Sequence, residues 1–336
     1  MEPSYATGLV WFRRDLRALD HAALYHALTQ CQQVHCVFVF DTDILAPLPR
    51  ADRRVEFIRE SLVELDAHLR ELSGHTQGGL IVLHAAAVDA VPQLAQALGA
   101  NAVFTNHDDE PQALQRDNAV RTQLARNGVA MHTYKDHTVL ERDEVLTQSG
   151  TPYSVFTPYK NAWLRKIDAF YLKSYPVERY AHRLAPRPPE HTRPVPTLGA
   201  IGFEQSTLGQ LKLPTGSRGA QQLFDDFLQR IERYEETRNF PAVKGPSYLS
   251  VHLRFGTISP RLLARTAHAL AQQGNPGAAT WLNELIWRDF YFQILYHHPH
   301  VAERSFKPAY DAIAWEQGDT AQALFKAWCD GQTGYP

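Results

Sequence analysis

The segment 281–291 gathers two indoles, a carboxylate and a guanidinium in one short stretch. Residues three and four apart share a helix face, so Glu284, Trp287, Arg288 and Tyr291 would form one aromatic and ionic surface. An Arg and a Glu in mainly apolar surroundings need each other or a ligand. The segment is therefore either a ligand-binding surface or an ordinary core helix with a Glu284–Arg288 ion pair. Most of the remaining circumference is apolar, which predicts burial: Leu285, Ile286, Phe290 and Ile294.

The composition is that of a globular protein with room for about two domains. The chain has 336 residues, of which 44% are hydrophobic and 21% charged. Its formal net charge is only −2, so any nucleic-acid surface must be a local basic patch.

The three cysteines, Cys31, Cys36 and Cys329, have neither paired nor zinc-ligand spacing. They indicate a reducing compartment and no metal site. The first residues have no apolar signal-peptide core, and no uncharged apolar run is long enough to span a bilayer. We therefore expect a cytoplasmic protein with no membrane contact.

The elements that must position the helix begin with an alternation of strands and helices. Short apolar strands separated by helices imply a parallel sheet covered on both faces. The predicted strands are 8–12, 34–41, 80–84, 102–106 and 129–134, and the predicted helices are 21–30, 51–72, 87–98 and 111–127. Asp20 and Asp52 are the candidate N-caps. The turn 11–17 contains no glycine, so the dinucleotide-binding fingerprint is absent.

The composition changes between about residues 172 and 220, where prolines and glycines are frequent. Such a segment predicts an extended interdomain linker. Beyond it the pattern is helical, at 220–238, 247–255, 260–273, 278–297 and 318–330. Ser259-Pro260 is typical of a helix start.

Four segments in order resemble the photolyase and cryptochrome family: 8–17, 153–163, 240–250 and 281–291. The similarity runs to the last residue and is greatest to bacterial class I cyclobutane pyrimidine dimer photolyases. The resemblance implies an α/β fold with a parallel doubly wound sheet, a long linker and an all-helical FAD-binding domain. The expected boundaries are 1–135 for the antenna domain, 136–219 for the linker and 220–336 for the first part of the helical domain.

The resemblance also implies a set of FAD contacts. In the family the segment around Ser247 contacts the FAD phosphates, and helix starts favour such anions. Pro246 stands where a hydroxyl residue is often found, and it removes two donors. The residues expected to bind the cofactor are Tyr234, Ser247, Leu249, Ser250, Trp281 and Arg288.

The implied reaction is light-driven splitting of pyrimidine dimers in UV-damaged DNA by an electron from reduced FAD. Photolyases extrude the lesion from the duplex. By resemblance, Trp287 stacks on the extruded dimer with Tyr291 nearby, Glu284 hydrogen-bonds its base edge and Arg238 contacts a phosphate. Trp315 matches the tryptophan that ends the photoreduction chain, and Trp328 is interpreted as core.

The second, antenna chromophore stays open. Folate-binding members place a glutamate where this chain has Ala113, so a deazaflavin, another flavin or no antenna remain the alternatives to folate. The family continues beyond the Gly-Tyr-Pro at 334–336, where its remaining flavin contacts lie. We therefore expect a truncated chain that binds FAD poorly and does not repair DNA alone.

Two other functions remain possible on the sequence. One is a cryptochrome-type blue-light photoreceptor, and the other is a stand-alone nucleotide-binding α/β module. We expect a monomer with no protein partner.

Overall fold

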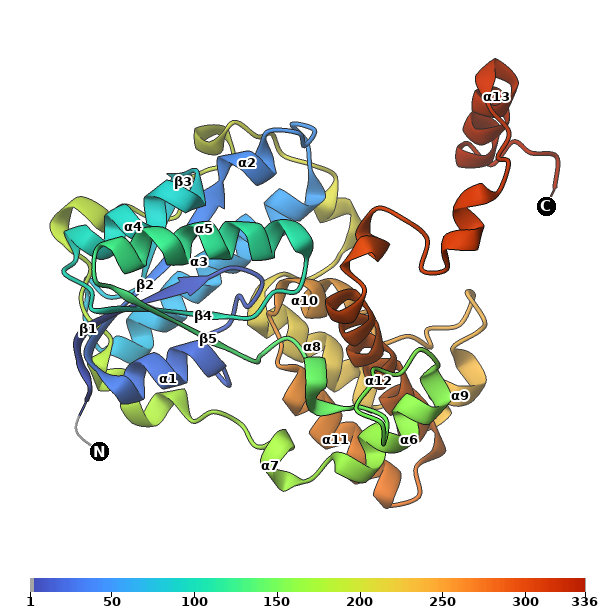
Figure 1. The fold of residues 1–336 in the computed structure, drawn as a ribbon, viewed down its shortest axis with the longest axis horizontal. Coiled ribbons are helices and arrows are strands. Elements are labelled where there is room, and N and C mark those ends of the chain that lie inside the picture. The colour runs from blue at the N-terminus through green and yellow to red at the C-terminus, as the bar shows by residue number, and fades with distance from the viewer. Residues whose placement is uncertain (1–2, 336) are drawn as a thin grey trace. The chain divides into compact units, whose positions relative to one another are not determined.

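The computed structural model describes residues 3–335. The chain divides into two compact units, Met1–His297 and His298–Pro336. The first unit contains a five-stranded parallel sheet with the order β3-β2-β1-β4-β5 (Figure 1). The predicted parallel doubly wound sheet is confirmed. Its strands are β1 (Tyr5–Phe12), β2 (Cys31–Asp41), β3 (Leu80–Ala85), β4 (Ala102–Asn106) and β5 (Ala130–Tyr134).

Alternate residues of the strands face two separate hydrophobic cores, as the period of a β-strand requires. Val10 and Phe12 join one core, whereas Leu9 and Trp11 join the other. The first core is covered by α1 (Ala22–Gln30) and α3 (Arg53–Ser73). The second is covered by α4 (Ala87–Ala97) and α5 (Pro111–Arg126), and the short α2 (Thr42–Leu45) follows β2.

One of the two predicted N-caps is wrong. Asp52 caps α3 as expected, because its carboxylate accepts a hydrogen bond from Arg54 N. At α1 the cap is His21, whose ring nitrogen accepts from Leu24 N. Asp20 instead adopts a left-handed backbone with φ 47° and turns its carboxylate to partners far along the chain.

The segment between β5 and the later helices contributes residues to the core beside the sheet and to the core that those helices form. It contains α6 (Phe156–Lys166) and α7 (Ala169–Leu172), followed by short 3-10 turns. Leu184 forms a parallel bridge with Val34 of β2, and Val177, Leu184 and Val195 enter the sheet core. The proline-rich stretch is therefore packed against the sheet rather than only wrapped over the surface.

The helices that follow share a third core with α6. They are α8 (Gly216–Leu228), α9 (Tyr234–Thr237), α10 (Ser250–Phe255), α11 (Pro260–Gln272) and α12 (Pro276–His297). The single helix predicted for 220–238 is wrong, because a 3-10 turn at Ile231–Arg233 separates α8 from α9. Gly277 of α12 lies against this turn, since a Cβ there would overlap the Ile231 carbonyl oxygen. The turn can therefore approach α12 closely.

The second unit contains α13 (Gly318–Cys329) and two 3-10 turns. No described side chain of α13 is buried, and Trp328 is 68% exposed. The interpretation of Trp328 as a core residue is wrong. Its ring stacks on Phe325, at 5.9 Å between centroids. Within the described residues, no helix has the length and apolar character needed to cross a bilayer.

Candidate functional site

Glu284 lies on α12, where it pairs with an arginine from another element. Its Oε1 accepts a hydrogen bond from Arg238 Nη1 at 2.5 Å, and the two side chains are 35% and 31% exposed. Arg238 follows α9 and also lies over the Tyr234 ring, 5.4 Å from its centroid. The Glu284–Arg288 pair of the core-helix alternative is therefore not found among the described residues, although both residues lie on the expected helix.

Arg288 is directed into the protein. Its guanidinium donates to the carbonyl oxygen of His137 and, at 3.3 Å, to that of Leu253. It also lies 4.7 Å from the centroid of Phe292. Burial lowers the pKa of Arg288 to about 10, and Arg14 and Arg254 act in the same direction. Arg288 thus binds the segment after β5 and the helix α10, and the surface predicted for four residues contains three.

Trp287 is half-buried in a stack of aromatic rings. Phe156 lies 3.6 Å away between centroids with 7° between the planes, and Tyr291 lies 5.5 Å away at 22°. Tyr291 is 61% exposed. We call Phe156, Trp287 and Tyr291 the aromatic stack. Together with Glu284 and Arg238 it presents ring surface, a carboxylate and a guanidinium at the surface of the unit.

The other predicted cofactor residues have different environments. Trp281 is buried between Phe224 and Phe227, and Tyr234 meets Phe227 edge-on. Leu249 is buried, whereas Ser250 is exposed at the first residue of α10. The helix predicted from residue 247 starts at Ser250, and Ser247 Oγ only accepts from Leu249 N at 3.5 Å. Trp315 belongs to the second unit and is 73% exposed.

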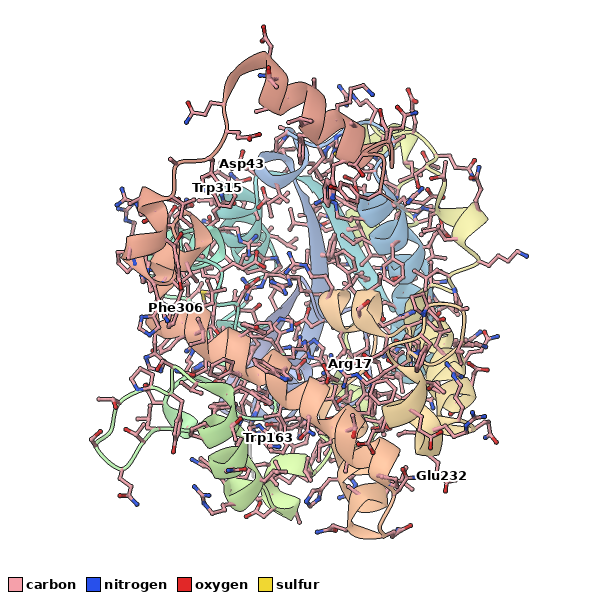
Figure 2. The ribbon with its side chains drawn as sticks, turned by 90° about the vertical axis from the view of Figure 1, so that its right-hand side faces the viewer. Arg17, Asp43, Trp163, Glu232, Phe306 and Trp315 are labelled. Carbon is pink, nitrogen blue, oxygen red and sulfur yellow. The ribbon has the colours of Figure 1, made fainter. Side chains whose placement is uncertain are left out.

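Asp289 of α12 was not predicted as a site residue, and it is buried. Its carboxylate accepts hydrogen bonds from Val139 N at 3.1 Å, Leu140 N at 3.0 Å and Trp163 Nε1 at 3.0 Å. Burial raises the pKa of Asp289 to about 6, against the lowering effect of these donors. Figure 2 shows Trp163 beside α12. The signal in the sequence was a carboxylate on the apolar face of α12.

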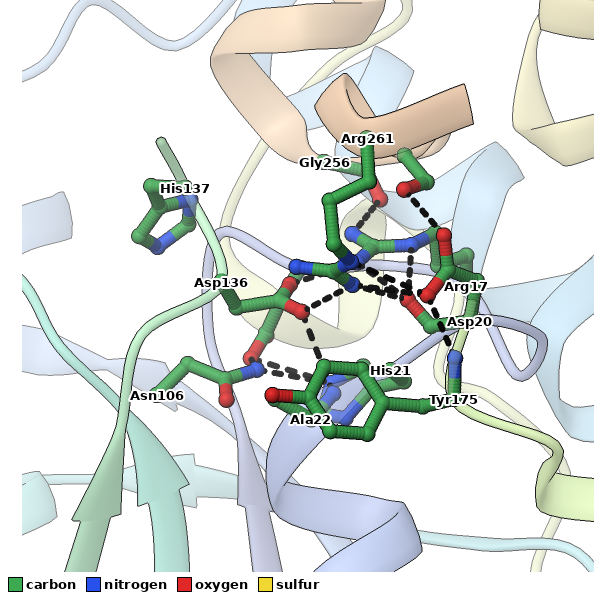
Figure 3. Close-up of polar contacts among 12 residues, drawn as sticks. Arg17, Asp20, His21, Ala22, Asn106, Asp136, His137, Tyr175, Gly256 and Arg261 are labelled. Atoms are coloured by element: carbon green, nitrogen blue, oxygen red, sulfur yellow. Dashed lines mark hydrogen bonds and ion pairs between the residues drawn. The ribbon is translucent and has the colours of Figure 1, made fainter. Parts of the chain in front are cut away.

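A buried ion network was also missed. Asp136 accepts from Arg17 Nη2 at 2.6 Å and from Arg261 Nη2 at 2.8 Å (Figure 3). Asp20 accepts from Arg261 Nε at 3.0 Å and from the hydroxyl of Ser259, the N-cap of α11. We call Arg17, Asp20, Asp136 and Arg261 the buried ion network. It joins the loops after β1 and β5 to α11, so it fixes the sheet to the helices.

A cavity of about 400 Å³ opens at the carboxyl ends of β1 and β2. We call it the strand-end cavity. Its wall combines apolar side chains such as Phe38 and Phe40 with Arg116 of α5 and the buried Ala113. Ligands of doubly wound sheets characteristically bind outside the carboxyl ends of the strands.

Arg116 is poorly compensated in this cavity. Its side chain is 15% exposed, and its two closest carboxylates, Asp41 and Asp117, lie at 3.8 and 3.6 Å. Its Nε is buried and forms no hydrogen bond. Burial and the neighbouring Arg13 both lower the pKa of Arg116. A buried cation in this condition is stabilised by an anionic ligand group.

Comparison with known proteins identifies the class. Residues 8–180 match the DNA photolyase family, and residues 281–336 match the FAD binding domain of DNA photolyase. The deoxyribodipyrimidine photo-lyase of a Synechococcus species is 33% identical over 98% of this chain and 68% of its own length.

Two solved structures show the same architecture. A bacterial class III photolyase from Agrobacterium tumefaciens superposes with a TM-score of 0.79 at 27% identity, covering 100% of this chain and 68% of that one. An archaeal photolyase from Sulfolobus tokodaii, solved with two FAD molecules, has a TM-score of 0.73 at 28% identity, covering 98% and 68%. Sheet, connecting segment and helices therefore define a protein of the photolyase type. The chain belongs to the DNA photolyase family.

Proposed function

We propose that this chain carries the damage-recognition surface of a deoxyribodipyrimidine photo-lyase, the class of enzyme that uses FAD and light to split pyrimidine dimers in UV-damaged DNA. Family membership supports the reaction class. The observation that carries the proposal is the surface formed by the aromatic stack, Glu284 and Arg238 on and beside α12. Ring surface with a nearby carboxylate and guanidinium suits an extruded base and its phosphate.

The residues expected to hold FAD fit a phosphate-bearing cofactor in one respect. Ser247 and Ser250 keep hydroxyls at the partly exposed start of α10, where they can donate to phosphate oxygens. Trp281 and Arg288 would support the site from the buried side. When bound, FAD supplies the photoexcited electron that opens the cyclobutane ring. Trp315 is proposed to supply electrons to the cofactor.

The residues of the surface have separate roles in this proposal. Trp287 and Tyr291 stack on the extruded pyrimidines, which places the dimer beside α12. Glu284 accepts a hydrogen bond from a base edge through Oε2, while its Oε1 stays paired with Arg238. Arg238, which is about one-third exposed, also contacts a DNA phosphate.

Dark binding to DNA tests these roles. We expect the protein to bind a duplex containing one thymine dimer more tightly than the matched undamaged duplex, measured by fluorescence anisotropy. W287A should reduce the ratio of the affinities for the damaged and undamaged duplexes about tenfold, which is the size of one stacking contact. R238A should weaken binding to both duplexes. It should also reduce the slope of log affinity against log salt concentration by about one unit. F170A is the control, because Phe170 is an exposed ring on α7 that belongs neither to the aromatic stack nor to the residues expected to bind FAD.

Equal affinity of the protein for the two duplexes would contradict the proposed function. That result would favour the photoreceptor or the nucleotide-binding module. The same proposal includes the domain boundaries 1–135, 136–219 and 220–336, and a cytoplasmic monomer.

We infer in addition that the strand-end cavity holds the second chromophore and that this chromophore carries a phosphate. The support is Arg116, whose buried Nε has no hydrogen-bond partner among the described residues and whose two ion pairs are long, in a wall that mixes apolar with other charged side chains. Ala113 offers no carboxylate to a pterin, which disfavours folate. The S. tokodaii photolyase shows that a protein of this fold can hold two FAD molecules.

Flavin binding tests the cavity assignment. FMN should bind more tightly than riboflavin, which lacks the phosphate, in equilibrium dialysis. R116Q should remove the difference by weakening FMN alone, about tenfold for one lost charge-assisted contact. R121Q is the control, because Arg121 lies on the same helix and bonds only Asn118. Equal binding of the two flavins by the unmodified protein would overturn the assignment.

A further inference from the structure

Phe156 belongs to no predicted set of site residues, yet it makes the closest ring contact of Trp287. It is the first residue of α6 and comes from the segment between the sheet and the later helices. The two ring centroids are 3.6 Å apart and the planes differ by 7°. Two rings this close and this parallel overlap almost completely, so Phe156 covers one face of the indole.

The position of Phe156 is fixed by the packing of α6. Tyr159 and Trp163 on the same helix are 1% and 0% exposed. Trp163 donates a hydrogen bond to Asp289, which lies two residues after Trp287 on α12. The helix that carries Phe156 is therefore tied to the helix that carries Trp287 by both packing and a buried hydrogen bond.

Phe290 holds the pair from the side. Its ring meets Phe156 edge-on at 5.9 Å and Trp287 edge-on at 5.7 Å. Edge-to-face contacts are favourable aromatic geometries, whereas a full face-to-face overlap is not the preferred one. The sandwich of Phe156 and Trp287 is thus maintained by its surroundings, which is typical of a preorganised site.

We infer that Phe156 is a positioning residue for lesion recognition: it backs the indole of Trp287 so that the ring is already oriented when a pyrimidine stacks against it. The inference rests on the proposed function, since it assigns a support to the stacking residue of that site. A ring held in place before binding loses less rotamer freedom when the base arrives. The base contact itself is made by Trp287 and the exposed Tyr291.

The test compares damaged and undamaged duplexes with variants of Phe156. F156L keeps much of the apolar volume but removes the ring, and F156Y keeps the ring. F156L should raise the Kd for the dimer-containing duplex about fivefold to tenfold while leaving the Kd for the undamaged duplex unchanged, and F156Y should behave as the unmodified protein. F170L is the control, because Phe170 is a 64% exposed phenylalanine on the neighbouring α7. Thermal unfolding of each variant confirms that it is folded.

The outcomes separate the two claims. If the unmodified protein prefers the damaged duplex and F156L keeps that preference, the positioning role is wrong and the proposed function stands. If F156L binds the damaged duplex more tightly, Phe156 competes with the base and the role is again wrong. If the unmodified protein has no preference, the proposed function falls and the positioning role falls with it.

Discussion

Replacing Asp136 with asparagine is expected to lower the free energy of unfolding by about 3–5 kcal/mol at neutral pH. Asp136 is fully buried and neutralises both Arg17 and Arg261, so the variant leaves two buried guanidinium groups without this partner. Urea denaturation followed by circular dichroism measures the change. The effect should be large because the buried ion network joins the loops after β1 and β5 to α11. Weakening the network therefore weakens the contact between the sheet and the helices.

The pH dependence of this loss has a defined sign. Burial alone would raise the pKa of Asp136, but Arg17 and Arg261 hold it well below its usual range. A depressed folded-state pKa contributes stability that is present above the unfolded value of about 3.9 and is lost as the pH falls. The difference between the unmodified protein and D136N should therefore be full at pH 7 and shrink below about pH 4.

An exposed ion pair provides the control for the network. Arg233 and Glu236 are 3.7 Å apart with side chains 72% and 75% exposed. Solvent screens such a pair, so E236Q should have little measurable effect. If D136N loses no more free energy of unfolding than E236Q, the buried ion network does not hold the sheet and the helices together.

Asp289 is expected to give the second large effect. D289A leaves three buried donors unpaired, Val139 N, Leu140 N and Trp163 Nε1, at about 1–3 kcal/mol each. We therefore expect a loss of at least about 3 kcal/mol in the free energy of unfolding. Lesion binding should also weaken, because Trp163 anchors the helix that carries Phe156.

The pH dependence at Asp289 has the opposite sign from that at Asp136. Burial raises the folded-state pKa to about 6, above the unfolded value of about 3.9. The folded protein therefore binds the proton more tightly, and stability falls as the pH rises from about 4 to about 6. Relative to D289N, which has no titrating group there, the unmodified protein should lose about 3 kcal/mol across this range. If the difference in stability between the unmodified protein and D289N does not change with pH, the pKa of Asp289 is not raised.

The elements of the fold could be predicted because each depends on a local pattern. The strands are short apolar runs, and the alternation of Val10 and Phe12 with Leu9 and Trp11 fits two covered faces. Asp52 and Ser259 cap helices through hydrogen bonds to nearby backbone N–H groups. The break between α8 and α9 was not predicted, and the turn that forms it packs against Gly277 of α12, which is distant in sequence.

The ion pairs could not be predicted because their partners are distant in sequence. Helix geometry offered Arg288 as the partner of Glu284, but Arg238 competes for the carboxylate and Arg288 is used by the carbonyls of His137 and Leu253. Asp20 looked like a cap for the helix that follows it, yet Arg261 satisfies it from 241 residues away. Burial and charge compensation across the fold decide these choices, and neither is visible in a local window.

The central residues of the candidate site were predicted, but the residues that hold them in place were not. Glu284, Trp287 and Tyr291 share one helix surface, as their spacing indicated. Phe156 and Asp289 were missed because a ring or a carboxylate on an apolar face resembles ordinary core until its neighbours are known.

The most direct measurement is a crystal structure of the protein bound to a duplex that contains a cyclobutane thymine dimer. The proposed function predicts a dimer turned out of the helix, stacked on the indole of Trp287 and within hydrogen-bond distance of Glu284, with Phe156 still behind the indole. A dimer that stays stacked within the duplex, or that contacts a surface remote from α12, would contradict it.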